Sequence, residues 1–229
     1  MKLYAALLAA LSLMLAACGS EAPAPAPDTR AQAEMPPEVP VMGEERLVLA
    51  LGDSLFTGYR LEEGESYPDM LEAALRARGI NVRMVNAGVS GDTTAAARGR
   101  LTFALDAQPR APDLVLISLG GNDMLRALPV EQARENLEAI MAELDERGID
   151  MVLLGMLAAP NLGEGYAQDF NAIYPSLAKK YDATLVPFFL QPLIANPSLA
   201  QADRIHPTRE GIEAMVSDTV DEIAGALQP

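Results

Sequence analysis

The sequence contains one cysteine and one histidine among its 229 residues, which is too few for several common kinds of site. A single cysteine excludes internal disulfides. A catalytic zinc ion commonly uses several histidines, so a zinc enzyme is poorly supported. The sequence also has no Gly-x-Gly-x-x-Gly dinucleotide motif after a predicted strand, and it has no P-loop. We therefore expect neither a metal ion nor an organic cofactor.

Basic side chains are scarce as well. The 17 Lys and Arg residues stand against 32 Asp and Glu residues, which gives a net charge of -15. Binding of nucleic acid depends on Lys and Arg that neutralise phosphates, so the composition argues against a nucleic-acid partner. Polyanionic substrates are disfavoured for the same reason, because no local basic cluster is evident. A solvated acidic surface is sufficient to explain the charge balance.

The apolar run at the N-terminus, residues 3–17, is too short for a membrane-spanning helix, which needs roughly 20 residues. Lys2 supplies a positive charge before it and small residues close it, which predicts a signal peptide over residues 1–17. Leu-Ala-Ala-Cys at residues 15–18 resembles the lipobox of bacterial lipoproteins. The resemblance implies cleavage before Cys18, acyl chains on its thiol, and a lipid-anchored protein on the periplasmic side of the cell envelope. Alternatively, Cys18 is an incidental residue of an ordinary secretory signal.

Residues 19–43 are dominated by Ala, Pro and Glu and contain too few large apolar side chains to form a core. We therefore predict a lipidated cysteine and an extended tether over residues 18–44, followed by one folded domain over residues 45–229. The length suits one well-packed domain and is short for two. We expect this domain to act as a monomer.

Short apolar runs alternate with longer segments of helical periodicity along the folded domain. The runs that predict strands are residues 46–51, 82–86, 113–119, 151–155 and 184–186. Their near-continuous apolar character is typical of a parallel sheet buried on both faces. The segments that predict helices are residues 67–78, 93–106, 130–147, 168–181 and 208–227, and Gly79 and Gly148 are typical helix stops. The alternation predicts a doubly wound α/β fold, a three-layer α/β/α sandwich around a five-stranded parallel sheet.

Chemically distinctive residues follow the first three predicted strands, at the edge where a doubly wound sheet carries its reactive groups. They are Gly-Asp-Ser-Leu at residues 52–55, Asn-Ala-Gly-Val-Ser-Gly-Asp at 86–92 and Gly-Gly-Asn-Asp at 120–123, and Asp-Arg-Ile-His-Pro follows at 203–207. In this order the four segments resemble the sequence blocks of the GDSL, or SGNH, hydrolase family. The likeness is greatest to its bacterial periplasmic thioesterase, arylesterase and lysophospholipase branch, and it extends to Gly-Tyr-Arg at residues 58–60. It implies a flavodoxin-like SGNH hydrolase fold, a catalytic triad of Ser54, Asp203 and His206, and an oxyanion hole formed by Ser54, Gly91 and Asn122.

The chemistry of these residues points to the same site. An alcohol is a poor nucleophile near neutral pH, so Ser54 needs a base, and His206 is the only histidine. Asp203, three residues earlier, can hold one imidazole nitrogen as a donor while the other accepts the serine proton. The oxyanion needs donors, for which Gly91 offers a backbone N–H without a neighbouring Cβ, Asn122 a side-chain amide, and Ser54 its own N–H. The Gly-x-Ser-x-Gly motif of other serine hydrolases is absent from the sequence.

Each of these residues also has an ordinary structural interpretation. Ser54 could cap a helix, and we expect Asp92 to cap the helix that begins near residue 93. Asn122 could be a turn former, and His206 could be a loop residue bonded to the backbone. We interpret Asp53 as structural, bonding the turn around Ser54.

An acyl chain needs an apolar pocket beside the nucleophile. The candidates are Met124, Leu125, Met156 and Leu157, for which a role in the core is equally open. In related thioesterases the segment that corresponds to residues 157–165 is a loop that helps to select acyl chains. This chain has Leu where the relatives often carry Arg, and its Pro is shifted, so the resemblance leaves the acyl preference open.

The predicted location favours carboxylic esters over acyl-CoA, because few acyl-CoA molecules occur outside the cytoplasm and an acidic surface disfavours the CoA phosphates. We therefore predict a serine esterase that acts on short or medium acyl esters, aryl esters or lysophospholipids through an acyl-enzyme on Ser54. The alternatives are an acyl thioesterase, a sugar O-deacetylase, and a catalytically inert envelope-binding lipoprotein that has kept the hydrolase fold.

Overall fold

The computed structural model describes residues 41–228. The predicted signal peptide, the predicted lipidation site at Cys18 and residues 18–40 of the predicted tether lie outside the described residues. Residues 41–45 form neither helix nor strand, and the first strand begins at Arg46. Within the described part of the chain, no helix combines the length and the apolar character needed to cross a membrane.

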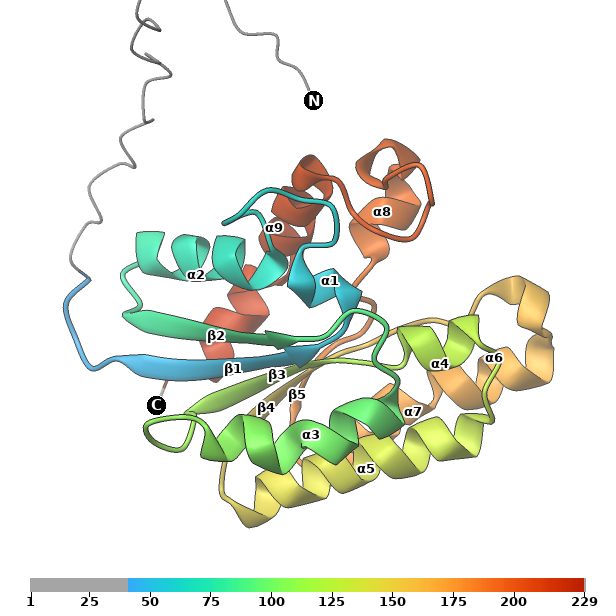
Figure 1. The fold of residues 1–229 in the computed structure, drawn as a ribbon, viewed down its shortest axis with the longest axis horizontal. Helices are drawn as coiled ribbons and strands as arrows, with labels where there is room; N and C mark the ends of the chain where they lie inside the picture. Colours follow the sequence, from blue (N-terminus) through green and yellow to red (C-terminus); the bar gives the residue numbers. More distant parts are fainter. Residues whose placement is uncertain (1–40, 229) are drawn as a thin grey trace, which may run out of the picture. The chain divides into compact units, whose positions relative to one another are not determined.

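Five parallel strands form the sheet in residues 41–228, in the order β2-β1-β3-β4-β5 (Figure 1). They are β1 (Arg46–Gly52), β2 (Val82–Gly88), β3 (Leu114–Ser118), β4 (Asp150–Leu154) and β5 (Thr184–Val186). The predicted five-stranded parallel sheet is confirmed, and its order is that of flavodoxin-like folds. The central strands β1, β3 and β4 are almost fully buried, because helices cover both of their faces, whereas the edge strands β2 and β5 are partly exposed.

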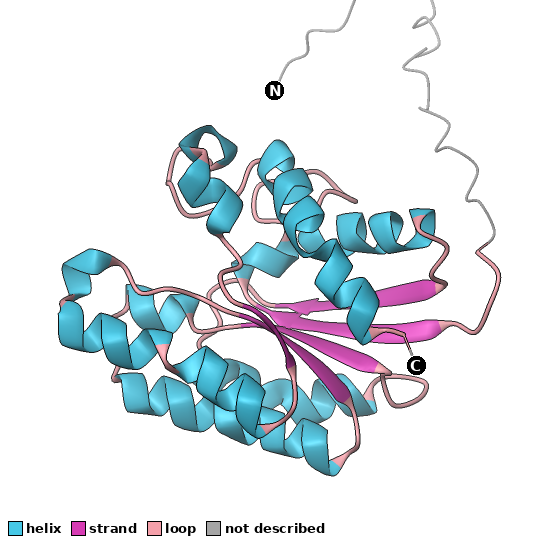
Figure 2. Cartoon of the chain, turned by 180° about the vertical axis from the view of Figure 1, so that it is seen from behind, coloured by secondary structure: helices cyan, strands magenta, loops and turns pink. Residues whose placement is uncertain are grey.

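Helices cover both faces of the sheet (Figure 2). α2 (Tyr67–Ala77) and α9 (Arg209–Ala226) pack together on one face, and α3 (Thr94–Asp106), α5 (Val130–Glu146) and α7 (Ile173–Lys180) cover the other. The predicted three-layer sandwich is confirmed. The predicted helix stops at Gly79 and Gly148 are also confirmed, since both glycines follow the caps of α2 and α5 with positive φ angles of 84° and 66°.

The prediction of one helix over residues 168–181 is wrong, because two helices occupy this region. α6 spans Glu164–Asn171, and α7 begins at Ile173. Pro175 explains the break, since it has no N–H to donate to the carbonyl of Asn171 and its ring would clash with that carbonyl in a continuous helix. The sequence did not predict three further helices that are too short to show periodicity, α1 (Ser54–Thr57), α4 (Gly121–Leu125) and α8 (Gln191–Ala195).

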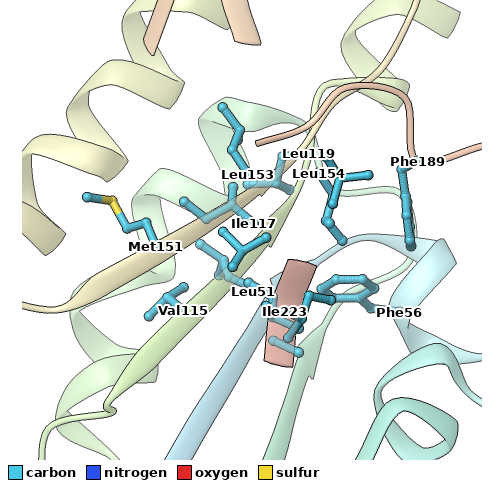
Figure 3. Close-up of a cluster of buried hydrophobic side chains, with 14 of the residues drawn as sticks. Leu51, Phe56, Val115, Ile117, Leu119, Met151, Leu153, Leu154, Phe189 and Ile223 are labelled. Carbon is cyan, nitrogen blue, oxygen red and sulfur yellow. The ribbon is translucent and has the colours of Figure 1, made fainter. Parts of the chain in front are cut away.

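The hydrophobic core holds the helix that carries Ser54. Figure 3 shows the side chain of Phe56 from α1 near that of Phe189; the two rings meet edge to face with 6.1 Å between their centroids, and both are fully buried. The ring of Phe56 also stacks on that of Tyr67, with 5.6 Å between the centroids. Full burial of such a side chain contributes about 1.5–3 kcal/mol. α1 is therefore anchored to the sheet although it is only four residues long.

The strand order changes direction at β1, which makes the edge beside this strand a topological switch point. The connection through α2 leads to β2 on one side of β1, and the connection through α3 then crosses to β3 on the other side. Sheets of this topology carry their reactive groups outside the carboxyl ends of the strands that flank the switch point. The last residue of β1, Gly52, is in register with the last residue of β3, Ser118, so the segments that follow lie side by side.

Candidate active site

Ser54, His206 and Asp203 form a continuous chain of hydrogen bonds. Ser54 Oγ lies 2.8 Å from His206 Nε2, and His206 Nδ1 lies 2.9 Å from Asp203 Oδ2. Ser54 is the first residue of α1, whereas Asp203 and His206 lie on the loop before α9. The fold thus brings together the three residues of the predicted triad, although 152 positions separate the serine from the histidine.

The carboxylate of Asp203 determines which imidazole nitrogen carries the proton. Hydrogen bonds from the side chain of His206, and then from the backbone N–H groups of His206 and Ile205, hold the pKa of Asp203 well below its usual range. An ionised carboxylate only accepts hydrogen bonds, so His206 Nδ1 donates to it. His206 Nε2 is then left to accept the hydroxyl proton of Ser54, which is the arrangement that a general base requires.

The turn after β1 holds Ser54 in place. Asp53 is the N-cap of α1, and its Oδ1 accepts a hydrogen bond from the N–H of Leu55 at 3.0 Å. A glycine is needed at residue 52, because a Cβ there would lie 2.5 Å from the ring of Phe56. The interpretation of Asp53 as a residue that bonds the turn around Ser54 is confirmed.

Donors predicted for the oxyanion hole remain available at this edge of the sheet. In residues 41–228, the backbone N–H groups of Ser54 and Gly91 have no hydrogen-bond acceptor. Gly91 has a φ of +85°, and a Cβ there would meet only Arg126 at 3.6 Å, so the left-handed backbone is what favours glycine at this position. Arg126 Nη2 donates to the carbonyl of Gly91 at 2.8 Å, which restrains this loop.

Asn122 joins the end of β3 to the end of β1. Its Nδ2 donates to Asp53 Oδ2 at 3.0 Å. Asp53 is 2% exposed, and burial raises its pKa from 3.8 to about 6 in spite of the hydrogen bonds from Leu55 and Asn122, which lower it. The sequence did not predict this bond, because the two residues belong to separate motifs and no spacing rule relates them.

The prediction that Asp92 caps the following helix is wrong. Thr93 is the N-cap of α3, and Asp92 instead binds Arg100, with 2.6 Å between Oδ2 and Nε. Asp92 and Thr93 are both of types that cap helices, so the sequence alone did not show which of them is the N-cap.

Asp123 accepts hydrogen bonds from the backbone N–H and the hydroxyl of Thr94 at 2.9 and 2.6 Å. This buried carboxylate ties α4 to α3.

The imidazole of His206 has a further contact that the sequence did not assign to the site. The ring centroids of Tyr59 and His206 lie 4.3 Å apart, with the planes tilted by 37°. Gln201 Nε2 donates to the carbonyls of Tyr59 and Pro207 at 2.9 and 2.8 Å, which joins the loop after α1 to the loop before α9. Tyr59 belongs to the segment 58–60, which resembles the GDSL hydrolase family. That resemblance is the signal in the sequence that could have placed Tyr59 at the site.

The four residues predicted to contact an acyl chain differ in exposure. Leu125 on α4 and Leu157 after β4 are 57% and 43% exposed, so both side chains are accessible beyond the carboxyl ends of the strands. Met124 is half-buried, and its sulfur accepts a hydrogen bond from the N–H of Ala159 at 3.3 Å. Met156 is 2% exposed and belongs to the hydrophobic core, which favours the core role left open for it.

The fold and these contacts define a serine hydrolase of the doubly wound α/β type, in which the serine follows the first strand. Residues 50–214 match the family model of the GDSL-like lipase/acylhydrolase family. The chain therefore belongs to this family, and it is an ester-hydrolysing enzyme.

Three similar proteins illustrate the range of this family. The chain is 39% identical over 163 residues to an arylesterase of Vibrio mimicus, with 71% of this chain and 80% of the relative covered. It is 35% identical over 182 residues to thioesterase 1/protease 1/lysophospholipase L1 of Escherichia coli strain K12, with 80% and 83% covered. Among solved structures, the SGNH-hydrolase family esterase AlinE4 is 55% identical with a TM-score of 0.69, and the match covers 82% of this chain and 100% of that chain.

Proposed function

We propose that this protein is a serine esterase that cleaves carboxylic esters through an acyl-enzyme on Ser54. The observation that carries this proposal is the 2.8 Å contact between Ser54 Oγ and His206 Nε2, with Asp203 bonded to the other imidazole nitrogen. An alcohol in contact with an oriented base is what nucleophilic acyl transfer needs first.

In the proposed reaction, Ser54 Oγ bonds to the ester carbonyl carbon while its proton passes to His206 Nε2. The carbonyl oxygen becomes an oxyanion that accepts hydrogen bonds from the N–H groups of Ser54 and Gly91 and from the amide of Asn122. The imidazolium keeps its Nδ1 proton bonded to Asp203 and gives its Nε2 proton to the leaving alcohol as the C–O bond breaks. Water then attacks the acyl-enzyme with His206 as base, and the carboxylic acid and the serine hydroxyl are released.

The proposed substrates are short or medium acyl esters, aryl esters or lysophospholipids. The exposed apolar side chains of Leu125 and Leu157 support an acyl group beside the site, and Leu125 lies on the same short helix as Asn122. The names of the Vibrio mimicus and Escherichia coli relatives support aryl esters and lysophospholipids. The net charge of -15 disfavours the phosphates of CoA.

Matched oxygen and sulfur esters of one acyl group test this substrate class. We expect kcat/KM for acyl-CoA to be lower than for the p-nitrophenyl ester by roughly tenfold or more, because an acidic surface slows the encounter with an anionic substrate. An uncharged thioester of the same acyl group serves as the control, and it should not show the additional loss. Added salt should raise the acyl-CoA rate by screening. A higher kcat/KM for both thioesters than for the oxygen ester would contradict the proposal.

An acyl thioesterase is the second candidate function. It is favoured by the name of the Escherichia coli relative, which begins with thioesterase 1. The same acyl chemistry serves both substrates, so the comparison of oxygen and sulfur esters decides between them. Release of acetate from an acetylated glycan, measured in the same panel, tests the sugar O-deacetylase.

Acidification should remove activity through the base. Hydrogen bonds from His206 hold the pKa of Asp203 well below its usual range, so within the triad it is the imidazole, and not the carboxylate, that takes up a proton in acid and can no longer accept one from Ser54. We expect kcat/KM to fall as the buffer is made more acidic, because the imidazolium cannot accept the proton of Ser54. The measurement is the rate with a neutral ester whose acylation is rate-limiting. A profile that stays flat as the pH falls would contradict the role of His206.

We further propose that the protein is anchored by acyl chains on Cys18 at the periplasmic side of the cell envelope and acts as a monomer. The likeness of residues 15–18 to a lipobox and the Pro- and Ala-rich composition of residues 19–43 support the anchor. The triad is complete within a single chain, so the proposed reaction does not require a second copy. Cys18→Ala should move the protein from the membrane fraction to the soluble fraction. Unchanged fractionation would contradict the anchor, and sedimentation as a dimer would contradict the monomer.

A further inference from the structure

One buried carboxylate beside the nucleophile takes no part in the proposed reaction. Asp53 is 2% exposed, and its raised pKa of about 6 reflects the unfavourable burial of its charge. Capping the N–H of Leu55 does not require that charge, because neutral Ser and Asn cap helices about as well as Asp does. The presence of an acid at this position therefore needs a different explanation.

The second carboxylate oxygen of Asp53 provides an explanation for the acid at this position. Oδ1 accepts from Leu55 N–H, and Oδ2 accepts from Asn122 Nδ2, each at 3.0 Å. The donor end and the acceptor end of an asparagine amide have nearly the same shape, so hydrogen-bond partners decide how the amide is turned. An ionised carboxylate accepts only, and it selects the orientation in which the NH2 group of Asn122 faces the turn that carries Ser54.

We propose that Asp53 is a positioning residue that orients the amide of Asn122 so that its NH2 group, and not its carbonyl oxygen, faces the oxyanion. One hydrogen of this NH2 group bonds to Asp53, and within residues 41–228 no acceptor takes the other. The second hydrogen is thus free for the substrate. The inference rests on the proposed function, in which Asn122 is an oxyanion donor.

The surroundings of Asp53 support this assignment. Its neighbour along the chain is Ser54, so an amide bonded to Asp53 is held beside the nucleophile. Arg100, which reaches the end of β1, is bonded to Asp92 and to the carbonyl of Gly52, and it makes no hydrogen bond to Asp53. In the described chain, the hydrogen bonds of the Asp53 carboxylate come from Leu55 and Asn122 alone.

The substitution Asp53→Asn tests the orientation, because it keeps the shape of the side chain and an oxygen for Leu55. Its new NH2 group faces the NH2 group of Asn122, and two donors cannot bond, so the Asn122 amide turns and presents its oxygen. We expect kcat/KM at pH 8 to fall about 100-fold, the loss typical of one oxyanion donor, with the change in kcat rather than in KM. Activity equal to that of the wild type would overturn the inference.

A double-mutant cycle separates this role from a general structural one. Asn122→Ala should itself lower kcat/KM by about 100-fold or more, and adding Asp53→Asn to it should change the rate less than about twofold. An equal loss in both backgrounds would overturn the inference while leaving the oxyanion role of Asn122 intact. Full activity of Asn122→Ala would instead overturn the proposed function on which the inference rests.

Thermal unfolding at pH 8 completes the test. The pKa of Asp53 is higher in the folded protein than its ordinary value of 3.8, so its charge destabilises the fold at pH values above about 6. Asp53→Asn should therefore have a Tm equal to or above that of the wild type while it loses activity. Asp53→Ser can still cap the N–H of Leu55, but its side chain is too short to reach Asn122. This variant should also lose activity, and the additional loss should likewise disappear when Asn122→Ala is already present. A lowered Tm together with a loss that persists in Asn122→Ala would show a purely structural Asp53 and overturn the inference.

Discussion

Ser54→Ala should lower kcat for hydrolysis of a p-nitrophenyl ester by a factor of roughly 10⁵, because the variant has no oxygen that can bond to the acyl group. The remaining rate should still exceed that in water by roughly 10³, since the oxyanion donors and substrate binding are untouched. The helix that carries residue 54 is held by Phe56 in the core and by the cap at Asp53, so the fold should be unchanged. Steady-state kinetics and circular dichroism check both expectations.

A matched control for this variant is Ser198→Ala. Ser198 is an exposed serine whose hydroxyl donates to the side chain of Asn196 at 2.8 Å, and it takes no part in the contacts of the triad. Its substitution should change kcat less than about twofold, as expected for a surface position. Retention of a tenth or more of the activity in Ser54→Ala would mean that another group is the nucleophile.

His206→Ala should cause a second loss of similar size, roughly 10⁵ in kcat. The hydroxyl of Ser54 then has no partner to take its proton, and the leaving alcohol has no acid to receive one from. Because the serine and the histidine act as a unit, the double variant Ser54→Ala, His206→Ala should be no slower than either single variant. The measurement is kcat for all three proteins with one ester.

Losses that multiply in the double variant would show that the two residues act independently. A residual activity of His206→Ala near the wild-type rate would point to a different base. If the wild type itself hydrolyses no ester in the panel, the alternative of an inert envelope-binding lipoprotein gains support, although the Ser54 to His206 contact is formed.

Much of the fold could be predicted because its signals are local. The central strands are buried on both faces, so their sequences read as continuous apolar runs, and the two glycines after α2 and α5 marked helix ends. The split between α6 and α7 was missed because the apolar periodicity continues through it, and Pro175 in the first turn of α7 carried the information instead. The short helices α1 and α4 were missed because four or five residues show no period.

The site could be predicted in its residue types and order but not in its contacts. The motifs after β1, β2 and β3 had to meet, since parallel strands end at one edge of the sheet. The bond between Asp53 and Asn122 and the contact between Tyr59 and His206 depend on side-chain geometry across long separations, which no spacing in the sequence encodes. The core position of Met156 likewise follows from packing, because apolar residues in a pocket and in a core look alike in sequence.

The most direct test of the central claim is peptide mapping of the protein after reaction with a fluorophosphonate, with the rate of labelling followed in the wild type and in His206→Ala. The 2.8 Å contact between Ser54 and His206 predicts a single adduct on the peptide that contains Ser54, formed far more slowly when the imidazole is removed. An adduct on another residue, or labelling of Ser54 at the same rate without His206, would contradict the account.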